Sequence, residues 1–167
     1  MSAPDLSHLK GRDHLIITMV CYGNICRSPM ATAVLFNKVS RIEKPKIFVD
    51  SAGTSNWHVG QGANPTSRRT WEKAGYFFDH IASQFDYSRL VAADLVLVMD
   101  RDNHAEVSKY VTNEEEERKI YYLRQFDLSG PDSLEVPDPY SLPDSAFEEV
   151  LEMVERATDG LIKKLLI

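Results

Sequence analysis

Short apolar runs alternate with amphipathic stretches along most of the chain. Four short segments rich in Val, Ile and Leu are predicted to be buried strands: 14–20, 46–49, 95–99 and 120–123. Between the first two, Ala31, Leu35 and Val39 recur at four-residue spacing, which places them on one face of a helix. Further helices are predicted over 66–73, 102–110 and from 145 towards the C-terminus.

Strands that alternate with helices predict an α/β fold, here a three-layer fold with a central four-stranded parallel sheet flanked by helices. Such sheets bind ligands beyond the carboxyl ends of their strands, near a topological switch point. Cys21 directly follows the first predicted strand. Ser28 and Pro29 have the residue types of an N-cap and a first helical position, so we expect a helix to begin there.

The remaining segments define loops and boundaries. Residues 51–65 and 125–143 contain several Gly and Pro and are expected to be irregular loops. Ser145 and Glu148 have the spacing of a capping box at the start of the last helix. Residues 1–13 are predicted to form an amino-terminal extension that could be mobile, and 14–167 a single domain. The acidic run 114–117 is expected to be solvated and without a role.

Composition narrows the class of function. The chain has 167 residues and a net charge of −6, so its surface as a whole should not attract nucleic acid or acidic membranes. The apolar run 15–20 is too short for a membrane span or a signal peptide. Only two cysteines occur, too few for a secreted disulfide scaffold, and we expect a reducing, cytoplasmic location.

The candidate chemistry lies between Cys21 and Arg27. In a turn between a strand and a helix, consecutive backbone N–H groups form an anion-binding nest, and the helix adds its free N–H groups and positive dipole end. Arg27 can donate two hydrogen bonds to phosphate oxygens, and the same positive field favours the thiolate form of Cys21. A bare Cys-x5-Arg also occurs by chance, as a structural cysteine with a surface arginine. The preceding strand and Gly23 favour the anion loop.

The longer sequence VCYGNICRSPMA at 20–31 resembles the signature loop of the low-molecular-weight protein tyrosine phosphatase family. The resemblance extends over 14–166, with DSAGT at 50–54, VMD at 98–100 and VPDPY at 136–140. It implies hydrolysis of protein phosphotyrosine and small aryl phosphates, without metal or cofactor. Cys21 would be the nucleophile, Arg27 would hold the phosphate oxygens, and Asp138 would be the general acid and then the base.

The resemblance also implies supporting roles. Ser28 would stabilise the cysteine sulfur, Asn24 and Ser51 would hold the loop by hydrogen bonds, and His80 is a further supporting residue. Trp57 and Tyr140 would wall the cleft. The phosphate-binding loop would be completed by Tyr22, Gly23, Ile25 and Cys26. Read without the family, these residues are ordinary turn, packing and surface residues, and His58, His80 and His104 show no metal-ligand spacing.

The chain departs from the family pattern at several positions. Ser83 stands where an arginine is common. The family usually has a glycine soon after the tyrosine of the acid loop, and many members carry a second aromatic beside it, whereas Ser141-Leu142-Pro143 follows Tyr140 here. Phosphoarginine phosphatases of the family tend to carry Thr at the position of Ile25. Arsenate reductases of the same fold need resolving cysteines downstream, and none follows Cys26. A phosphate-binding module without activity is the remaining alternative.

The expected partners are phosphotyrosine proteins or peptides, without nucleic acid or a membrane span, for a monomer or weak homodimer. Cys21 is expected to be exposed and therefore sensitive to peroxide. Cys26 could then capture its sulfenic acid as a disulfide, which makes the enzyme redox-sensitive; a buried packing role for Cys26 is the alternative.

Overall fold

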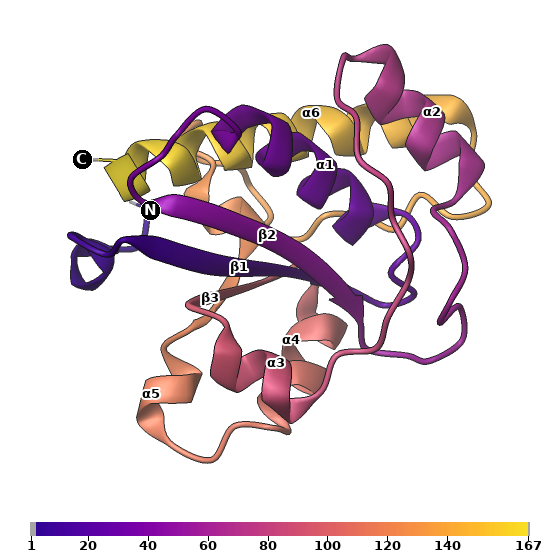
Figure 1. The fold of residues 1–167 in the computed structure, drawn as a ribbon. Coiled ribbons are helices and arrows are strands. Elements are labelled where there is room, and N and C mark those ends of the chain that lie inside the picture. Colours follow the sequence, from indigo (N-terminus) through magenta and orange to yellow (C-terminus); the bar gives the residue numbers. More distant parts are fainter. Residues whose placement is uncertain (1–2, 167) are drawn as a thin grey trace.

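The computed structural model describes residues 3–166 and contains one parallel sheet (Figure 1). Its strands are β1 (His14–Cys21), β2 (Lys46–Gly53), β3 (Leu95–Val98) and β4 (Ile120–Tyr122), in the order β2-β1-β3-β4. All neighbouring strands are parallel. The predicted fold, a four-stranded parallel sheet flanked by helices, is confirmed.

Helices cover both faces of the sheet (Figure 1). α1 (Arg27–Val39) and α6 (Asp144–Leu166) pack together on one side, and α2 (Pro65–Lys73) lies against both. α3 (Tyr87–Ala92), α4 (Arg101–Ser108) and the short α5 (Glu114–Glu117) lie on the other side. Two short 3-10 helices, η1 (Ser7–Leu9) and η2 (Leu123–Phe126), complete the described elements.

The alternation of side chains in β3 divides the apolar residues between two cores. Leu95 and Leu97 belong to the core under α1 and α6, while Val96 and Val98 belong to the core under α3 and α4. Successive residues of a strand point to opposite faces, so a continuous apolar run can fill both cores. This burial on both faces explains why the strands read as unbroken apolar segments.

Some predicted boundaries were wrong. β2 extends to Gly53, because its last residues pair with the end of β1 up to Cys21↔Gly53, so Ser51 lies in a strand and not in a loop. α1 begins at Arg27, and Ser28 is not its N-cap. α6 begins at Asp144, one residue before the predicted cap. Tertiary pairing and packing set these ends, and residue type alone does not.

The acidic run 114–117 is not merely a solvated segment. It forms α5, in which Glu116 is buried. The Glu116 carboxylate accepts hydrogen bonds from the Tyr87 hydroxyl at 2.6 Å and from the Thr112 backbone N–H at 2.9 Å. Glu116 therefore joins α5 to α3, a role that the prediction of a featureless charge run missed.

The amino-terminal segment contributes to the core. Leu6 and Leu9 are 3% and 5% exposed and pack with the residues under α1 and α6. Residues 1 and 2 of the predicted extension lie outside the described part of the chain. The division into an extension and a domain at residue 14 stays a prediction.

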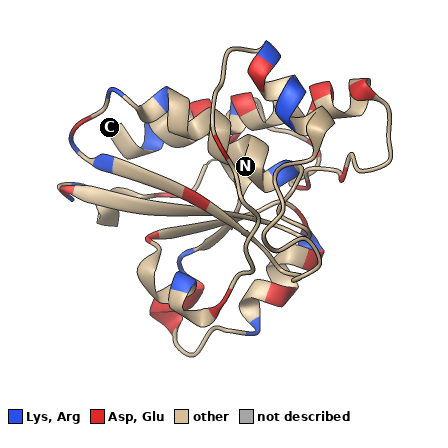
Figure 2. Ribbon diagram, turned by 45° about the vertical axis from the view of Figure 1, so that its right-hand side comes forward, with Lys and Arg blue, Asp and Glu red and all other residues tan. Residues whose placement is uncertain are grey.

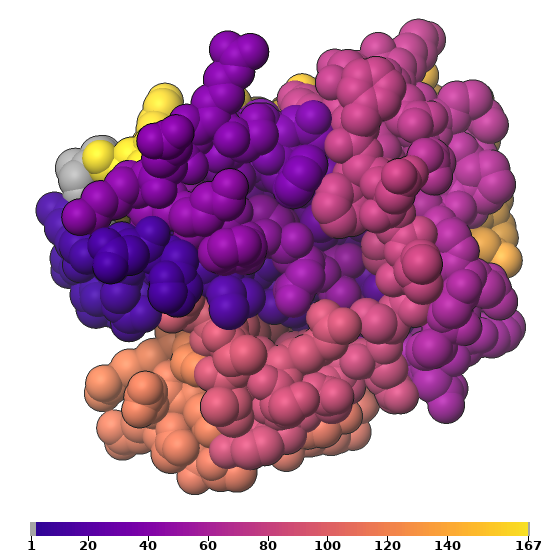
Figure 3. Space-filling view, in the orientation of Figure 1, coloured from indigo at the N-terminus to yellow at the C-terminus, as the bar shows by residue number. Residues whose placement is uncertain are grey.

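The segment between α2 and α3 runs along the surface beside the end of β2, as the rose-coloured band of Figures 1 and 3 shows. Gly53 and Gln84 form a parallel bridge there, and the Gly53 N–H donates to the Ser83 carbonyl at 2.8 Å. The carboxyl end of the edge strand β2 is therefore covered by chain, close to the loop after β1.

Charged residues of both signs are scattered along the helices in the ribbon of Figure 2. Within residues 3–166, no helix has both the length and the apolar character needed to cross a membrane. A bound anion would therefore have to be attracted by a local group of charges and dipoles.

Candidate active site

The loop from Cys21 to Arg27 lies at the switch point of the sheet. Cys21 ends β1, and Arg27 begins α1. From β1 the chain passes to β2 on one side, and β3 lies on the other side. The first N–H groups of α1 and its positive dipole end are directed at this loop, which favours an anion there.

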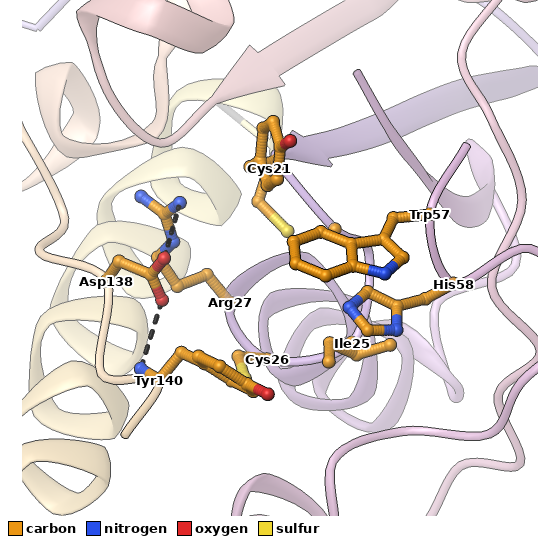
Figure 4. A pocket seen from close by; sticks show the side chains of 10 residues that line it. Cys21, Ile25, Cys26, Arg27, Trp57, His58, Asp138 and Tyr140 are labelled. Atoms are coloured by element: carbon orange, nitrogen blue, oxygen red, sulfur yellow. Dashed lines mark hydrogen bonds and ion pairs between the residues drawn. The ribbon is translucent and has the colours of Figure 1, made fainter. Parts of the chain in front are cut away.

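A cavity of about 200 Å³ opens over the loop (Figure 4). It brings together most of the residues that the sequence singled out, from segments more than a hundred positions apart. Its lining consists of Cys21, Tyr22, Gly23, Ile25, Cys26, Arg27, Trp57, His58, Asp138 and Tyr140. The lining does not include four of the predicted supporting residues, which are hydrogen-bonded to one another around the loop: Asn24, Ser28, Ser51 and His80.

The cavity has two walls of different kinds (Figure 4). Asp138 and Tyr140 form one wall. The other carries Trp57 and His58, whose rings stack at 5.3 Å with an interplanar angle of 13°. From the sequence, His58 was considered only as a possible metal ligand. Its position next to Trp57 was the only indication that it would line this wall. Its Nδ1 lies 3.0 Å from the Gln61 side-chain oxygen, which fixes the ring.

Cys21 lines the cavity but is only 2% exposed, so the expectation of an exposed cysteine was wrong. Its Sγ lies 3.0 Å from the Ser28 hydroxyl. That hydroxyl oxygen accepts a hydrogen bond from the Asn24 amide at 2.7 Å. The Ser28 proton is therefore free to be directed at the sulfur, where it would stabilise a negative charge.

Asn24 adopts a left-handed conformation, with φ of 57°, and is completely buried. Its amide also donates to the Ser51 hydroxyl at 2.9 Å, and its side-chain oxygen accepts from the Ser83 N–H at 2.9 Å. Asparagine tolerates this conformation better than most residues. The network of hydrogen bonds holds the loop in a conformation that would otherwise be unfavourable.

His80 supports the same residue from its backbone side. Its Nε2 lies 2.6 Å from the Asn24 carbonyl oxygen, which can only accept, so Nε2 carries a proton. Burial lowers the pKa of His80, although the hydrogen bond to Asn24 opposes this effect. The ring is therefore held neutral at physiological pH.

Arg27 is 3% exposed and is already bound on one side. Its Nη1 donates to Asp100 at 2.7 Å and to the Val136 carbonyl at 2.9 Å, while its Nη2 lies 3.9 Å from Asp138. Burial disfavours the charge, but the Cys21 sulfur and Asp100 raise the pKa of Arg27 above its ordinary value. Asp100 was not predicted as a site residue, although it ends the segment VMD on which the family resemblance partly depended.

Ser83, the serine at the position where an arginine is common, is contacted by an arginine from elsewhere. Arg89 of α3 donates to the Ser83 hydroxyl at 2.8 Å and to the Ser51 carbonyl at 3.2 Å. The guanidinium group thereby holds the segment 80–85 against β2. No signal in the sequence connected position 89 with this place.

The segment 135–143 approaches the cavity from the opposite side. Asp138 has a side chain that is 53% exposed, and one of its oxygens accepts from the Tyr140 N–H at 3.1 Å. The next residue, Ser141, has φ of 67°. Glycine is the residue that adopts such a conformation without strain.

The fold and the site define an α/β protein with a Cys-x5-Arg loop between its first strand and helix, and a carboxylate facing that loop. The sequence matches the model of the family described as low molecular weight phosphotyrosine protein phosphatase over residues 16–166. The chain belongs to this family: it is a phosphatase, and therefore a hydrolase.

Individual relatives agree with this assignment. A low molecular weight protein-tyrosine-phosphatase of Streptomyces coelicolor is 41% identical over 149 residues, which are 87% of this chain and 90% of the relative. The crystal structure of a protein tyrosine phosphatase from Entamoeba histolytica superposes with a TM-score of 0.84 and 34% identity, over 90% of this chain and 96% of the other. The YwlE arginine phosphatase of Geobacillus stearothermophilus superposes with a TM-score of 0.77 and 28% identity, over 90% and 92% of the two chains.

Proposed function

We propose that this phosphatase hydrolyses protein phosphotyrosine and small aryl phosphates through a phosphocysteine intermediate. One observation carries the proposal. A single cavity contains Cys21 and Arg27 on the anion-binding loop and Asp138 on the facing wall, between aromatic side chains. The proposed nucleophile, phosphate-binding arginine and proton donor would thus all face a phosphate ester bound in this cavity.

In the first step the Cys21 thiolate attacks the phosphorus, and the bond from phosphorus to the phenolic oxygen breaks. Asp138 donates its proton to the departing phenolate oxygen. The loop N–H groups and the free edge of Arg27 hold the equatorial oxygens as charge develops on them. Asp100 and the Val136 carbonyl already hold Nη1 of Arg27, so the guanidinium group is oriented before substrate binds.

In the second step a water molecule attacks the phosphocysteine. Asp138, now ionised, accepts a proton from the water, the S–P bond breaks, and inorganic phosphate and the Cys21 thiolate are released. The Ser28 hydroxyl, 3.0 Å from the sulfur, stabilises the thiolate as it leaves. The same carboxyl group therefore serves as acid and then as base.

The walls of the cavity favour an aromatic ester. Trp57 and Tyr140 offer flat apolar surfaces for a phenyl ring, and Ile25 offers no polar partner to a phosphoguanidinium group. We therefore expect kcat/KM to be much higher for phosphotyrosine peptides than for phosphoarginine or phosphoserine peptides. Comparable values for the three would defeat this choice of substrate, and a preference for phosphoarginine would favour the activity named for the Geobacillus relative.

Redox sensitivity is a further part of the proposal. Cys21 and Cys26 are both free thiols that line the same cavity. Peroxide would oxidise Cys21 to a sulfenic acid, and the Cys26 thiol would displace water from it to form a disulfide. Burial raises the pKa of the Cys26 thiol to about 12, so this capture should be slow. Cys26→Ala should recover less activity with a thiol reductant than the wild type; equal recovery would exclude Cys26 as the resolving thiol.

We further propose that the enzyme is cytoplasmic, because its two cysteines are free thiols that a reducing compartment preserves. We also propose that it is a monomer or a weak homodimer.

Turnover of p-nitrophenyl phosphate tests the proposed function directly. Wild-type protein should release p-nitrophenol, and Cys21→Ser should abolish turnover with an unchanged melting temperature, because a hydroxyl is a far weaker nucleophile than a thiolate. Cys26→Ser is the matched control in the same loop and should keep appreciable activity. Substantial turnover by Cys21→Ser would show that the nucleophile is another group.

A further inference from the structure

Arg124 is a buried arginine whose hydrogen bonds are incomplete. It lies in η2, directly after β4, and is 8% exposed. Its Nη1 donates to the Glu135 carbonyl at 2.7 Å. Its Nε is buried and has no partner among the residues that the structure describes. A charged side chain in such surroundings costs stability, so its contact with Glu135 needs a reason.

Glu135 and Val136 form the stem of the segment 135–143, which carries Asp138. The next residue, Val136, donates its N–H to the Met99 carbonyl at 2.7 Å and accepts from Arg27 at 2.9 Å. Two guanidinium groups therefore hold successive carbonyls of the stem, a few residues before the acid. One of them, Arg27, belongs to the phosphate-binding loop.

Beyond this stem the segment is held weakly. Within the described part of the chain, the hydrogen bonds of residues 137–142 join only residues of that stretch, such as Tyr140 N–H to Asp138 and Leu142 N–H to Pro139. The ion pair of Asp138 with Arg27 is long, at 3.9 Å. The direction in which Asp138 points is therefore set mainly where the stem is anchored.

Arg124 is not needed to neutralise the neighbouring buried carboxylate. Asp127 is paired with Arg156 at 3.2 Å and accepts from the Ser129 hydroxyl at 2.6 Å. Without a second task, an apolar side chain of similar length would be the more stable choice at position 124. The Glu135 carbonyl is the contact that an apolar side chain could not make.

We propose that Arg124 is a positioning residue for the general acid: it fixes the stem of the segment 135–143 through the Glu135 carbonyl, so that Asp138 reaches the leaving-group oxygen. The inference rests on the proposed function, in which Asp138 is that acid. Arg124 touches no substrate atom and acts only through the backbone of the stem.

The central experiment measures kcat/KM of Arg124→Met for aryl phosphates with progressively poorer leaving groups, from p-nitrophenyl to phenyl phosphate. We expect a loss of about tenfold for phenyl phosphate and of less than about twofold for p-nitrophenyl phosphate, since a misplaced acid matters most for a leaving group that needs its proton. Inhibition by inorganic phosphate should stay within about twofold of the wild type, because the phosphate loop is untouched. The melting temperature should not fall.

Two further variants separate positioning from stability. Arg156→Met removes the other arginine beside Asp127, which does not touch the stem, and should lower the melting temperature without changing the leaving-group dependence. Arg124→Lys keeps one donor for the Glu135 carbonyl and should recover part of the loss with phenyl phosphate. If Arg124→Met does not fold, Arg124→Lys and Arg124→Gln provide the same leaving-group series.

A double-mutant cycle distinguishes this inference from the proposed function. If Arg124 acts through Asp138, adding Arg124→Met to Asp138→Asn should cause no further loss. A uniform loss across leaving groups, additive losses, or wild-type kinetics of Arg124→Met would each overturn the inference while Asp138→Asn alone still confirmed the acid. An unaffected Asp138→Asn enzyme would overturn the assignment of the acid and the inference with it.

Discussion

The two segments that face each other across the cavity are built differently. In the loop 21–28 the key side chains are buried, and Asn24 makes hydrogen bonds to Ser28, Ser51 and Ser83. In the segment 135–143 the stem is anchored, but Asp138 and Tyr140 are about half exposed. The difference fits the two tasks that we propose for these segments. Binding a phosphate requires donors fixed in advance, while a proton donor must also admit substrates and release products.

The first prediction concerns the exposed segment. Asp138→Asn should lower turnover by about 10²–10⁴-fold, the usual contribution of general acid catalysis, and the loss should be smaller for good leaving groups. The measurement is kcat/KM over the same series of aryl phosphates. Because Asp138 is half exposed, the melting temperature should hardly change. A loss that is independent of the leaving group would argue that Asp138 is structural, and the contrast between the two segments would then fail.

The second prediction concerns the buried loop. Asn24→Ala leaves the partners of Asn24 without their hydrogen bonds and places alanine at φ of 57°. Each unsatisfied buried group costs about 1–3 kcal/mol, so kcat/KM should fall about 10- to 100-fold and the protein should be destabilised. In contrast to Asp138→Asn, the loss should be uniform over leaving groups, and inorganic phosphate should inhibit less. Unchanged phosphate inhibition would show that the loop does not need Asn24.

A third, smaller effect should appear in the pH dependence of stability. Burial lowers the pKa of His80 in the folded protein, so the folded state favours the neutral ring. The stability that this provides is complete above the unfolded pKa of about 6.5 and is lost as the pH falls below it towards the lower folded pKa. The wild type should therefore lose more stability between about pH 7 and pH 5 than His80→Gln. Parallel melting curves against pH would contradict this.

The smallest effect is expected at Ser141, on the exposed side. A non-glycine residue with φ of 67° carries strain of about 1 kcal/mol, which glycine removes. Glycine also makes the unfolded chain more flexible by a similar amount, so Ser141→Gly should change the free energy of unfolding by less than about 0.5 kcal/mol. Turnover should stay within about twofold. A larger change in turnover would show that the backbone at Ser141 helps to set the position of Asp138.

Local sequence predicted much of the site because its chemistry is contiguous. Cys21, Arg27 and the turn between them lie in one short segment, so residue types and spacing were enough to indicate an anion loop. Asp138 could be proposed only through the family resemblance, since an aspartate between prolines is otherwise a turn residue. Asp100, Arg89 and Arg124 were missed, because the hydrogen bonds by which they support the site join separate segments of the chain and leave no local pattern.

Some positions have a meaning that only the packed molecule reveals. Gly160 lies inside α6, where a glycine ordinarily weakens a helix. A Cβ at this position would lie 1.7 Å from the Phe126 carbonyl oxygen, so the glycine allows η2 to approach the helix. The same approach places η2, and with it Arg124, beside the stem of the acid-bearing segment.

The sequence by itself determined the four strands, the helices that correspond to α1, α2, α4 and α6, and the residues of the proposed phosphate loop, because periodicity, turn chemistry and a short motif are local properties; α3 and α5 were not predicted. The tertiary structure alone decided where β2 ends, that Ser28 faces a sulfur instead of capping a helix, and that Glu116 is buried. It also decided which arginines hold the two segments that face each other across the cavity. Hydrogen bonds between residues far apart in the chain depend on how the folded segments pack, and a local sequence pattern does not determine that packing.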